Sequence, residues 1–164
     1  MSKFTVMGVP IGKERARTVT LPNGMKRSYT PKKTKDYESL IAYEYKRQCG
    51  EFYGDMENSK LKQAVVLKID IYFSIPKSYS KGKRLAAECN SIRPTKKPDI
   101  DNVVKSVLDA LNGVAYKDDT QVAELSVRKW WTADNDRIDV WIDKAKAGTQ
   151  NDGQDENSTA DYWD

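Results

Sequence analysis

The prediction of the fold starts from one segment, Lys97-Pro98-Asp99-Ile100-Asp101-Asn102-Val103-Val104-Lys105. Pro98 disfavours a helical conformation at the residue before it, so a helix is predicted to begin just after this point. Downstream, apolar residues recur at helical spacing and form a single stripe that is expected to face a core. The members of this stripe are Val103, Val104, Val107, Leu108 and Leu111. The segment therefore predicts an amphipathic helix with two aspartates at its N-terminal end.

Carboxylates are concentrated around this predicted helix. Asp99 and Asp101 lie at its N-terminal end, and a further acidic pair, Asp118 and Asp119, follows it. At about 100° per residue, Asp101 and Lys105 share one flank of the apolar stripe, where the core meets water. Helix N-termini attract phosphate, and carboxylates held there can bind a hard cation that bridges to phosphate. The arrangement favours metal-assisted chemistry on a phosphate group.

Each of these residues also has an ordinary structural interpretation. Asp99 or Asp101 can serve as a helix N-cap, and Asp101 can form an i, i+4 ion pair with Lys105. Asp118 and Asp119 can simply belong to a turn. Taken one at a time, the structural interpretation of each residue is the commoner one.

The same residues resemble a known family. The ordered set Lys97-Pro98-Asp99-Ile100-Asp101-Asn102, Lys105, Asp109-Ala110-Leu111-Asn112-Gly113 and Lys117-Asp118-Asp119 is similar to the core of the RusA family of Holliday junction resolvases. The similarity extends to Gly8–Arg17 and Tyr29–Glu38, and spans residues 3–143. It implies a magnesium-dependent, dimeric endodeoxyribonuclease that cuts four-way DNA junctions in recombination and repair. Such proteins are often carried by phages and prophages, so we expect a protein that acts in the bacterial cytoplasm.

The resemblance also implies roles for individual residues. Asp99, Asp101 and Asp119 match the family's catalytic aspartates and are expected to hold Mg²⁺, for which Mn²⁺ is a substitute; Asp118 is a secondary metal candidate. Lys105 matches the catalytic lysine, which is expected to stabilise charge in the transition state or on the leaving oxygen. No other small-molecule cofactor is expected. Three such aspartates in family order, in a chain without histidine, favour the catalytic interpretation over the structural one.

The composition excludes several other kinds of site. None of the 164 residues is histidine, which rules out histidine-dependent catalytic triads and histidine-ligated zinc. Cys49 and Cys89 have no metal-ligand spacing and no disulfide framework, so any metal must be held by oxygen. No run approaches the ~20 apolar residues that span a bilayer, and the N-terminal residues lack the apolar region of a signal peptide. We therefore expect no membrane partner and no export.

Positive charge is concentrated in the N-terminal part of the chain. The first 35 residues contain nine Lys and Arg residues and one acidic residue, Glu14. Such clustering favours a polyanionic partner, here branched DNA, and the alternative is a solvated basic face. The candidate DNA contacts are Lys13, Arg15, Arg17, Lys32, Lys33, Lys96 and Lys97.

The predicted architecture is one α+β domain over residues 1–144, with a single mixed β-sheet flanked by helices. Residues 145–164 form an acidic tail in which Lys146 is opposed by five acidic residues, and its composition predicts disorder. Whether this tail screens the basic face stays open.

The predicted order of elements is β-β-β-α-β-α-α-β-β. A strand from Phe4 is followed by a hairpin around Asn23-Gly24 and by a helix from an N-cap at Thr34 to Cys49. Its predicted buried side is Tyr37, Leu40, Ile41 and Tyr45. A strand over 64–73 is predicted to bury its odd-numbered residues and to leave Lys68 and Asp70 in solvent. A short helix over 81–89 precedes the central helix, and strands over 122–131 and 137–143 are predicted to pair with each other.

Two further functions are compatible with these residues. One is a basic DNA-binding protein whose carboxylates are structural. The other is a different magnesium-dependent phosphotransfer enzyme, although the chain has no glycine-rich phosphate loop.

Overall fold

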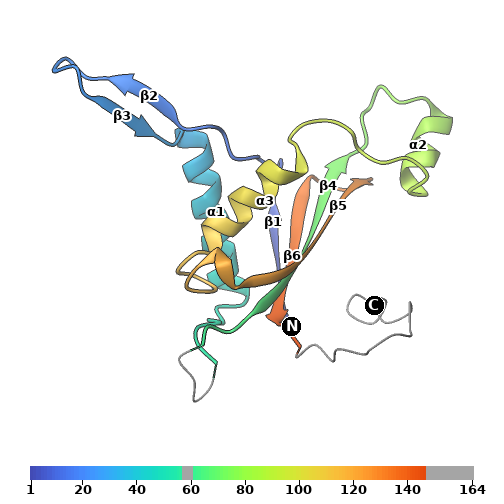
Figure 1. Cartoon of the computed structure of the whole chain (residues 1–164). Helices are drawn as coiled ribbons and strands as arrows, with labels where there is room; N and C mark the ends of the chain where they lie inside the picture. The colour runs from blue at the N-terminus through green and yellow to red at the C-terminus, as the bar shows by residue number, and fades with distance from the viewer. Residues whose placement is uncertain (57–60, 147–164) are drawn as a thin grey trace, which may run out of the picture.

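A computed structural model describes residues 1–56 and 61–146, and these residues have the predicted α+β architecture. The order of elements is confirmed (Figure 1). They are β1 (Ser2–Met7), β2 (Arg17–Thr20), β3 (Lys26–Tyr29), α1 (Lys32–Gln48), β4 (Val65–Ser74), α2 (Lys81–Glu88), α3 (Ile100–Leu111), the 3-10 turn η1 (Asp119–Gln121), β5 (Val122–Thr132) and β6 (Arg137–Lys144). The predicted acidic tail from residue 147 onward lies outside the described residues.

The main sheet is mixed, with strand order β1-β6-β4-β5. β4 pairs in parallel with β5 and antiparallel with β6, so the predicted pairing of the last two strands with each other is wrong. The physical reason is that β4 is the strand whose residues are buried almost throughout, and such a strand takes a central position. The short connection from β5 to β6 crosses the end of β4, where the Asp136 carboxylate accepts hydrogen bonds from the Ser74 backbone N–H and hydroxyl.

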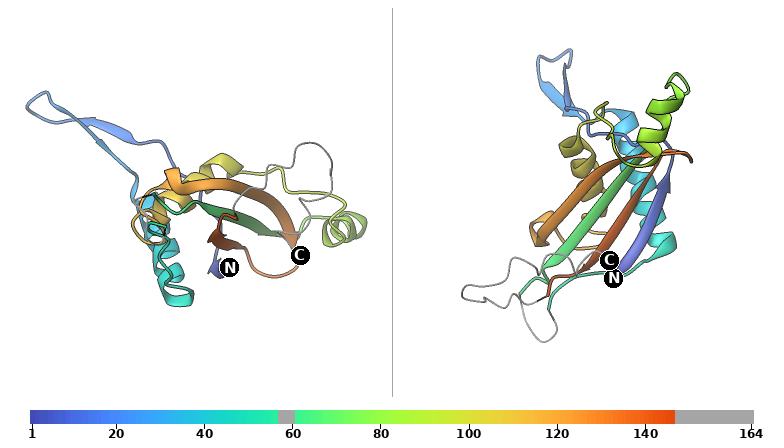
Figure 2. Two further views of the ribbon diagram at one scale, coloured as in Figure 1. Left: turned by 60° about the horizontal axis from the view of Figure 1, so that its bottom comes forward. Right: turned by 90° about the vertical axis from the view of Figure 1, so that its right-hand side faces the viewer.

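Helices α1 and α3 cover one face of this sheet (Figure 2). The odd-numbered residues of β4 point into the core between them, as predicted: Val65, Leu67, Ile69, Ile71 and Phe73. The α3 stripe is also confirmed, since Val103, Val107 and Leu111 are fully buried and Val104 and Leu108 pack against the core.

Helix α1 departs from its prediction in two respects. It begins at Lys32, after Pro31, and Thr34 is a buried residue inside the first turn whose hydroxyl accepts a hydrogen bond from the Glu14 backbone N–H (3.3 Å). Leu40 is 39% exposed although it was predicted to be buried. Tyr37, Ile41 and Tyr45 form the buried line at four-residue spacing, and Leu40 lies about 100° away from Ile41 around the helix axis.

The opposite face of the sheet contains a charged network that was predicted to be solvated. Lys68 and Asp70 are instead 8% and 4% exposed. Asp70 accepts hydrogen bonds from Arg128 Nε and Trp130 Nε1, both at 3.0 Å. Because β4 is central, side chains from its neighbouring strands cover these groups. Asp70 therefore lies on the face away from α3 and is not part of the site described below.

The hairpin of β2 and β3 confirms the prediction at Asn23-Gly24, with Gly24 at φ +79°. All eight residues of its strands are exposed, and the hairpin projects away from the sheet and helices (Figure 1). Within the described residues, no helix is long and apolar enough to cross a membrane.

Candidate active site

The N-terminal end of α3 presents two carboxylates to solvent. Asp99 is the N-cap residue, but its side chain makes no capping hydrogen bond, and Val103 N–H instead bonds to the Asp99 carbonyl (3.2 Å). Asp101 lies in the first turn, and both side chains belong to exposed residues. The positive end of the helix dipole favours negative charge here. These carboxylates are therefore available to a ligand and are not used in capping.

Lys105 lies one turn beyond Asp101 on the same exposed side of α3. Among residues 1–56 and 61–146, neither Asp101 nor Lys105 takes part in an ion pair. The i, i+4 ion pair that was the structural alternative is thus absent from this structure. The ammonium group of Lys105 remains available to an anion.

The basic loop that leads into Asp99 is fastened to β5. Arg93 stacks on Trp130, with its guanidinium carbon 3.1 Å from the ring centroid, and donates a hydrogen bond to the Lys129 carbonyl (3.0 Å). Lys129 Nζ in turn donates to the Lys96 carbonyl (2.8 Å). The Lys96 ammonium lies 4.6 Å from the Phe73 ring centroid, so this predicted DNA contact also packs against the core. The loop is held from both of its ends.

Lys129 is a site residue that the sequence prediction missed. Burial lowers the pKa of the Lys129 amino group, and the negative charge of Asp99 opposes this effect. The register of β5 with β4 puts Lys129 on the helix-covered face, between Val127 and Trp131. A lysine at a position where strand alternation calls for an apolar residue was the available signal.

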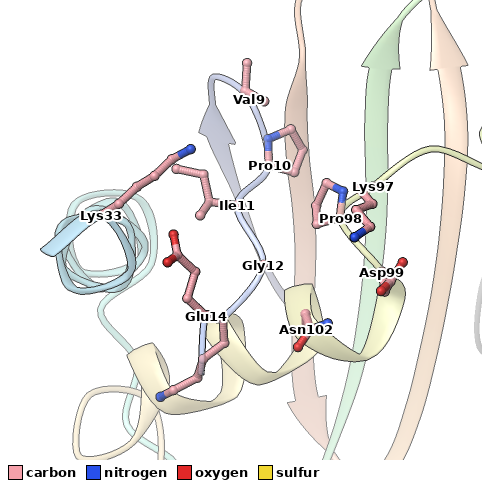
Figure 3. Close-up of a pocket in the computed structure, with 11 residues that line it drawn as sticks. Val9, Pro10, Ile11, Gly12, Glu14, Lys33, Lys97, Pro98, Asp99 and Asn102 are labelled. Carbon is pink, nitrogen blue, oxygen red and sulfur yellow. The ribbon is translucent and has the colours of Figure 1, made fainter. Parts of the chain in front are cut away.

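A cavity of about 630 Å³ lies between the N-terminal end of α3 and the segment Val9–Glu14, named here the strap (Figure 3). Lys33 lines it on one side, and Lys97 and Asp99 on the other. The strap lies so close to α3 that a Cβ atom at Gly12 would be 2.8 Å from the Asn102 Cβ atom. The Lys13 backbone N–H also bonds to the Asn102 carbonyl (2.8 Å). The strap is thereby fixed against the carboxylates.

The side chain of Lys13 joins three parts of the chain. The Lys13 side chain is 23% exposed. Its amino group forms ion pairs with Glu38 of α1 (3.0 Å) and with Asp109 of α3. Burial lowers the pKa of Lys13, but the hydrogen bonds to Asp109 and Glu38 outweigh this and raise it overall. The contact of Lys13 with DNA stays a prediction, and in this structure its charge is balanced by two carboxylates. Asp109, which belongs to the ordered set of family residues, is one of these two partners.

The second acidic pair opens η1. Asp118 is the N-cap of this turn and accepts a hydrogen bond from Thr120 N–H (3.0 Å). Hydrogen bonding to the side chain of Thr120, and then to its backbone, lowers the pKa of the Asp118 carboxyl. Gln121 completes a capping box, and its buried amide donates to three backbone carbonyls. Asp118 thus has a structural role as an N-cap, and its role as a metal ligand stays a prediction. The spacing Asp118-x-x-Gln121 is a capping-box pattern that the sequence already contained.

The predicted metal ligands are not all gathered in one place. Asp99 and Asp101 lie at the N-terminal end of α3, whereas η1 with Asp119 lies by its C-terminal end (Figure 1). In the described ranges, no three acidic or cysteine side chains converge as a group that could hold one metal ion. Asp99 and Asp101 alone supply the one or two carboxylates by which proteins ordinarily bind Mg²⁺ with water in the other positions. The residues present thus fit a hard cation at the N-terminal end of α3.

Comparison with known proteins assigns the chain to a family. Residues 8–143 match the family described as endodeoxyribonuclease RusA. The chain belongs to the RusA family. The matched region contains α1, α3, the strap and all four predicted catalytic residues. A relative, the uncharacterized protein YqaN of Bacillus subtilis (strain 168), is 36% identical over 147 residues, which are 88% of this chain and 97% of the relative.

Membership of this family indicates a nuclease that acts on DNA. RusA proteins are endodeoxyribonucleases, hydrolases that act on the phosphodiester bonds of DNA. The family indicates DNA recombination and branched DNA as the setting of the activity.

Proposed function

We propose that this protein is a magnesium-dependent, structure-selective endodeoxyribonuclease that resolves four-way DNA junctions by paired phosphodiester hydrolysis. The observation that carries the proposal is the pair of exposed carboxylates at the N-terminal end of α3, Asp99 and Asp101. Within the described chain, neither carboxylate caps the helix or forms an ion pair. In a chain of this family, such a pair next to an unpaired lysine suits a reacting phosphate.

Asp99 and Asp101 hold the cation in this proposal. Asp119, which lies by the C-terminal end of α3, keeps its predicted catalytic role from the family resemblance alone. Mg²⁺ supplies hydroxide near neutral pH and stabilises charge on the phosphate, and Mn²⁺ substitutes for it. Lys105 donates hydrogen bonds to a non-bridging or leaving oxygen, where its positive charge has the greatest effect in the transition state. Lys97, at the border of the cavity beside Asp99, offsets the repulsion between the carboxylates and the incoming phosphate.

The DNA backbone is bound mainly by exposed cations around the cavity and beyond it. Arg15, Arg17, Lys32 and Lys33 are exposed, and Lys33 lines the cavity itself. Each cation that neutralises a phosphate releases a counterion, so binding is expected to weaken steeply with salt. Lys13 and Lys96 contribute less in this proposal, because their amino groups already contact protein groups.

A homodimer suits the substrate. A four-way junction is resolved by two symmetry-related cuts, which two copies of one active site related by a two-fold axis deliver. We expect the protein to act in the cytoplasm of a bacterium, as a host or a phage product.

The test is incubation of the full chain with a synthetic four-way junction and with a linear duplex of the same sequence, with and without Mg²⁺. We expect paired nicks in the junction, little cutting of the duplex, and no cutting after chelation. Tight binding without cutting of any branched DNA would point to a non-catalytic DNA-binding protein instead.

A further inference from the structure

The β2–β3 hairpin is an exposed element that contains Arg17, Lys26 and Arg27 and no acidic residue. Residues 15–35, which include it, contain seven Lys and Arg residues and no acidic residue. Every residue of both strands is exposed, and the hairpin extends away from the body of the molecule (Figure 1; Figure 2). The hairpin does not contribute to a core. Its exposed, cationic composition favours a polyanionic partner outside the chain.

The two faces of the hairpin differ in chemistry. Residues opposite each other in an antiparallel pair point to the same side, and the pairs are Arg17 with Tyr29 and Val19 with Arg27. These four residues form one face, named here the arginine face. The other face consists of Thr18, Thr20, Lys26 and Ser28. Val19 and Tyr29 are each 42% exposed, so the arginine face combines two guanidinium groups with uncovered apolar surface.

We propose that this hairpin lies in the major groove of a DNA duplex, with its arginine face toward the base edges. The inference rests on the proposed function only in taking DNA as the polyanion. The major groove is about 12 Å wide and admits a two-stranded ribbon, whose strands are ~4.8 Å apart. Arginine is the commonest reader of guanine edges, and an apolar side chain such as Val19 suits the thymine methyl group. The arginine face carries two arginines with the larger apolar surface of Val19 and Tyr29, whereas the opposite face carries one cation, Lys26, among small hydroxyl side chains.

The hairpin is also coupled to the candidate active site. Arg17 lies three residues after the end of the strap. The strap is held against α3 by the Lys13–Asn102 backbone hydrogen bond and by the close approach at Gly12. Arg17 makes one contact with the body, an exposed pair with Glu14 at 3.4 Å, which is weak enough to exchange for DNA. Bases read by the hairpin would therefore lie at a set distance from Asp99 and Asp101. The consequence is a sequence preference near the cut.

The decisive comparison is between Arg27→Ser and Lys26→Ser. These neighbouring residues lie on opposite faces, and each substitution removes one positive charge and leaves the same side chain. Binding is measured in the full chain without divalent metal, on a four-way junction and on a panel of linear duplexes of different sequence. We expect Lys26→Ser to weaken binding slightly and equally on every sequence. Arg27→Ser is expected to weaken binding to the preferred sequence by about tenfold or more and to level the differences between sequences.

Equal losses from the two substitutions, or an unchanged sequence preference in Arg27→Ser, would overturn the inference. Partial unfolding would lower binding to all sequences alike, so it does not imitate the expected result. The outcome is also separate from that of the proposed function. A chain that cuts no junction but shows the face-dependent effect on duplexes keeps the hairpin inference, and a chain that resolves junctions with equal losses from both variants keeps only the proposed function.

Discussion

At the scale of single residues, two neighbouring aspartates have different tasks. The Asp118 carboxylate caps η1 and belongs to a capping box with Gln121. The Asp119 side chain has no capping contact, although its charge, with those of Asp109 and Asp118, adds to the burial that raises the pKa of Tyr116. At the other end of α3, the Asp99 side chain makes no capping hydrogen bond, and Asp101 lies in the first turn of the helix. The family resemblance gave Asp119 a catalytic role and Asp118 a secondary role as a metal candidate, and of the two only the Asp118 carboxylate makes a capping hydrogen bond.

Asp101→Asn tests the metal assignment. Asparagine keeps the size of the side chain and is about as good at a helix N-terminus as aspartate, but it removes the charge that Mg²⁺ needs. We expect a folded protein that binds junctions at least as well as the parent and cuts them more slowly by a factor on the order of 10² or more. Single-turnover cleavage and gel-shift binding measure the two effects separately. Near-parental cutting would exclude Asp101 from the site.

Asp118→Ala and Asp119→Ala separate capping from catalysis. Loss of the Asp118 cap leaves the Thr120 N–H without its partner, so the melting temperature should fall by a measurable amount, and Asp118→Asn should restore it. Asp119→Ala should leave the melting temperature close to that of the parent and slow junction cutting. Thermal melts paired with cleavage rates at a permissive temperature give the comparison. The opposite pattern would exchange the roles of the two residues.

Lys129→Met tests the residue that fastens the basic loop. Methionine retains much of the stem that packs near Phe73 but loses the hydrogen bond to the Lys96 carbonyl and the positive charge near Asp99. A displaced loop would shift Lys97 and Asp99, and small displacements of reacting groups cost on the order of 10²-fold in rate. We expect slower cutting with nearly unchanged junction binding, and partial recovery in Lys129→Arg. Equal losses of binding and cutting would make Lys129 an ordinary DNA contact.

At the scale of elements, the prediction succeeded where local pattern decides the outcome. The α3 stripe, the β4 alternation and the Asn23-Gly24 hairpin each follow from short-range periodicity or turn chemistry. The start of α1 was predicted three residues late, because Thr34 has the chemistry of an N-cap but is buried against the strap. The hydrogen bond from Lys129 to the Lys96 carbonyl in the basic loop joins residues 33 positions apart. Such a contact depends on which strands become neighbours, which local pattern does not contain.

Gly12→Ala tests whether the strap must touch α3. A Cβ atom at this position would meet the Asn102 Cβ atom at 2.8 Å and the Pro98 Cβ atom at 3.0 Å, so the strap has to move. We expect a loss of about 1–3 kcal/mol in the free energy of unfolding, as for other overpacked sites, together with slower cutting. Gly82→Ala is the matched control, because its Cβ atom meets nothing within 4 Å inside α2, and it should stabilise the protein by about 0.5–1 kcal/mol. Denaturant unfolding of both variants decides the point.

At the scale of the whole molecule, the sheet separates two environments. The face covered by α1 and α3 leads to the candidate active site, whereas the opposite face contains the Asp70 and Asp139 network. The central place of β4 produces this division, and it was not predicted, because β5 and β6 were expected to pair with each other. The buried Asp70 carboxylate lies on the face opposite α3, so it is not part of the candidate active site, although β4 is a central strand of the sheet.

The last prediction concerns the assembly that makes two cuts. We expect a homodimer in solution at micromolar concentration, and sedimentation of the free protein and of its junction complex measures this. In a mixture of parent and Asp101→Asn subunits, a two-fold dimer contains heterodimers with one active subunit, which should nick a single strand. A supercoiled plasmid that extrudes a cruciform reports the difference, because paired cuts within one complex linearise it and single cuts leave an open circle. As the share of Asp101→Asn subunits rises, linear product should fall with the square of the active fraction, while open circles rise to a maximum at equal shares and then fall. A linear fall in both products, or monomers both free and on DNA, would mean that each subunit cuts independently.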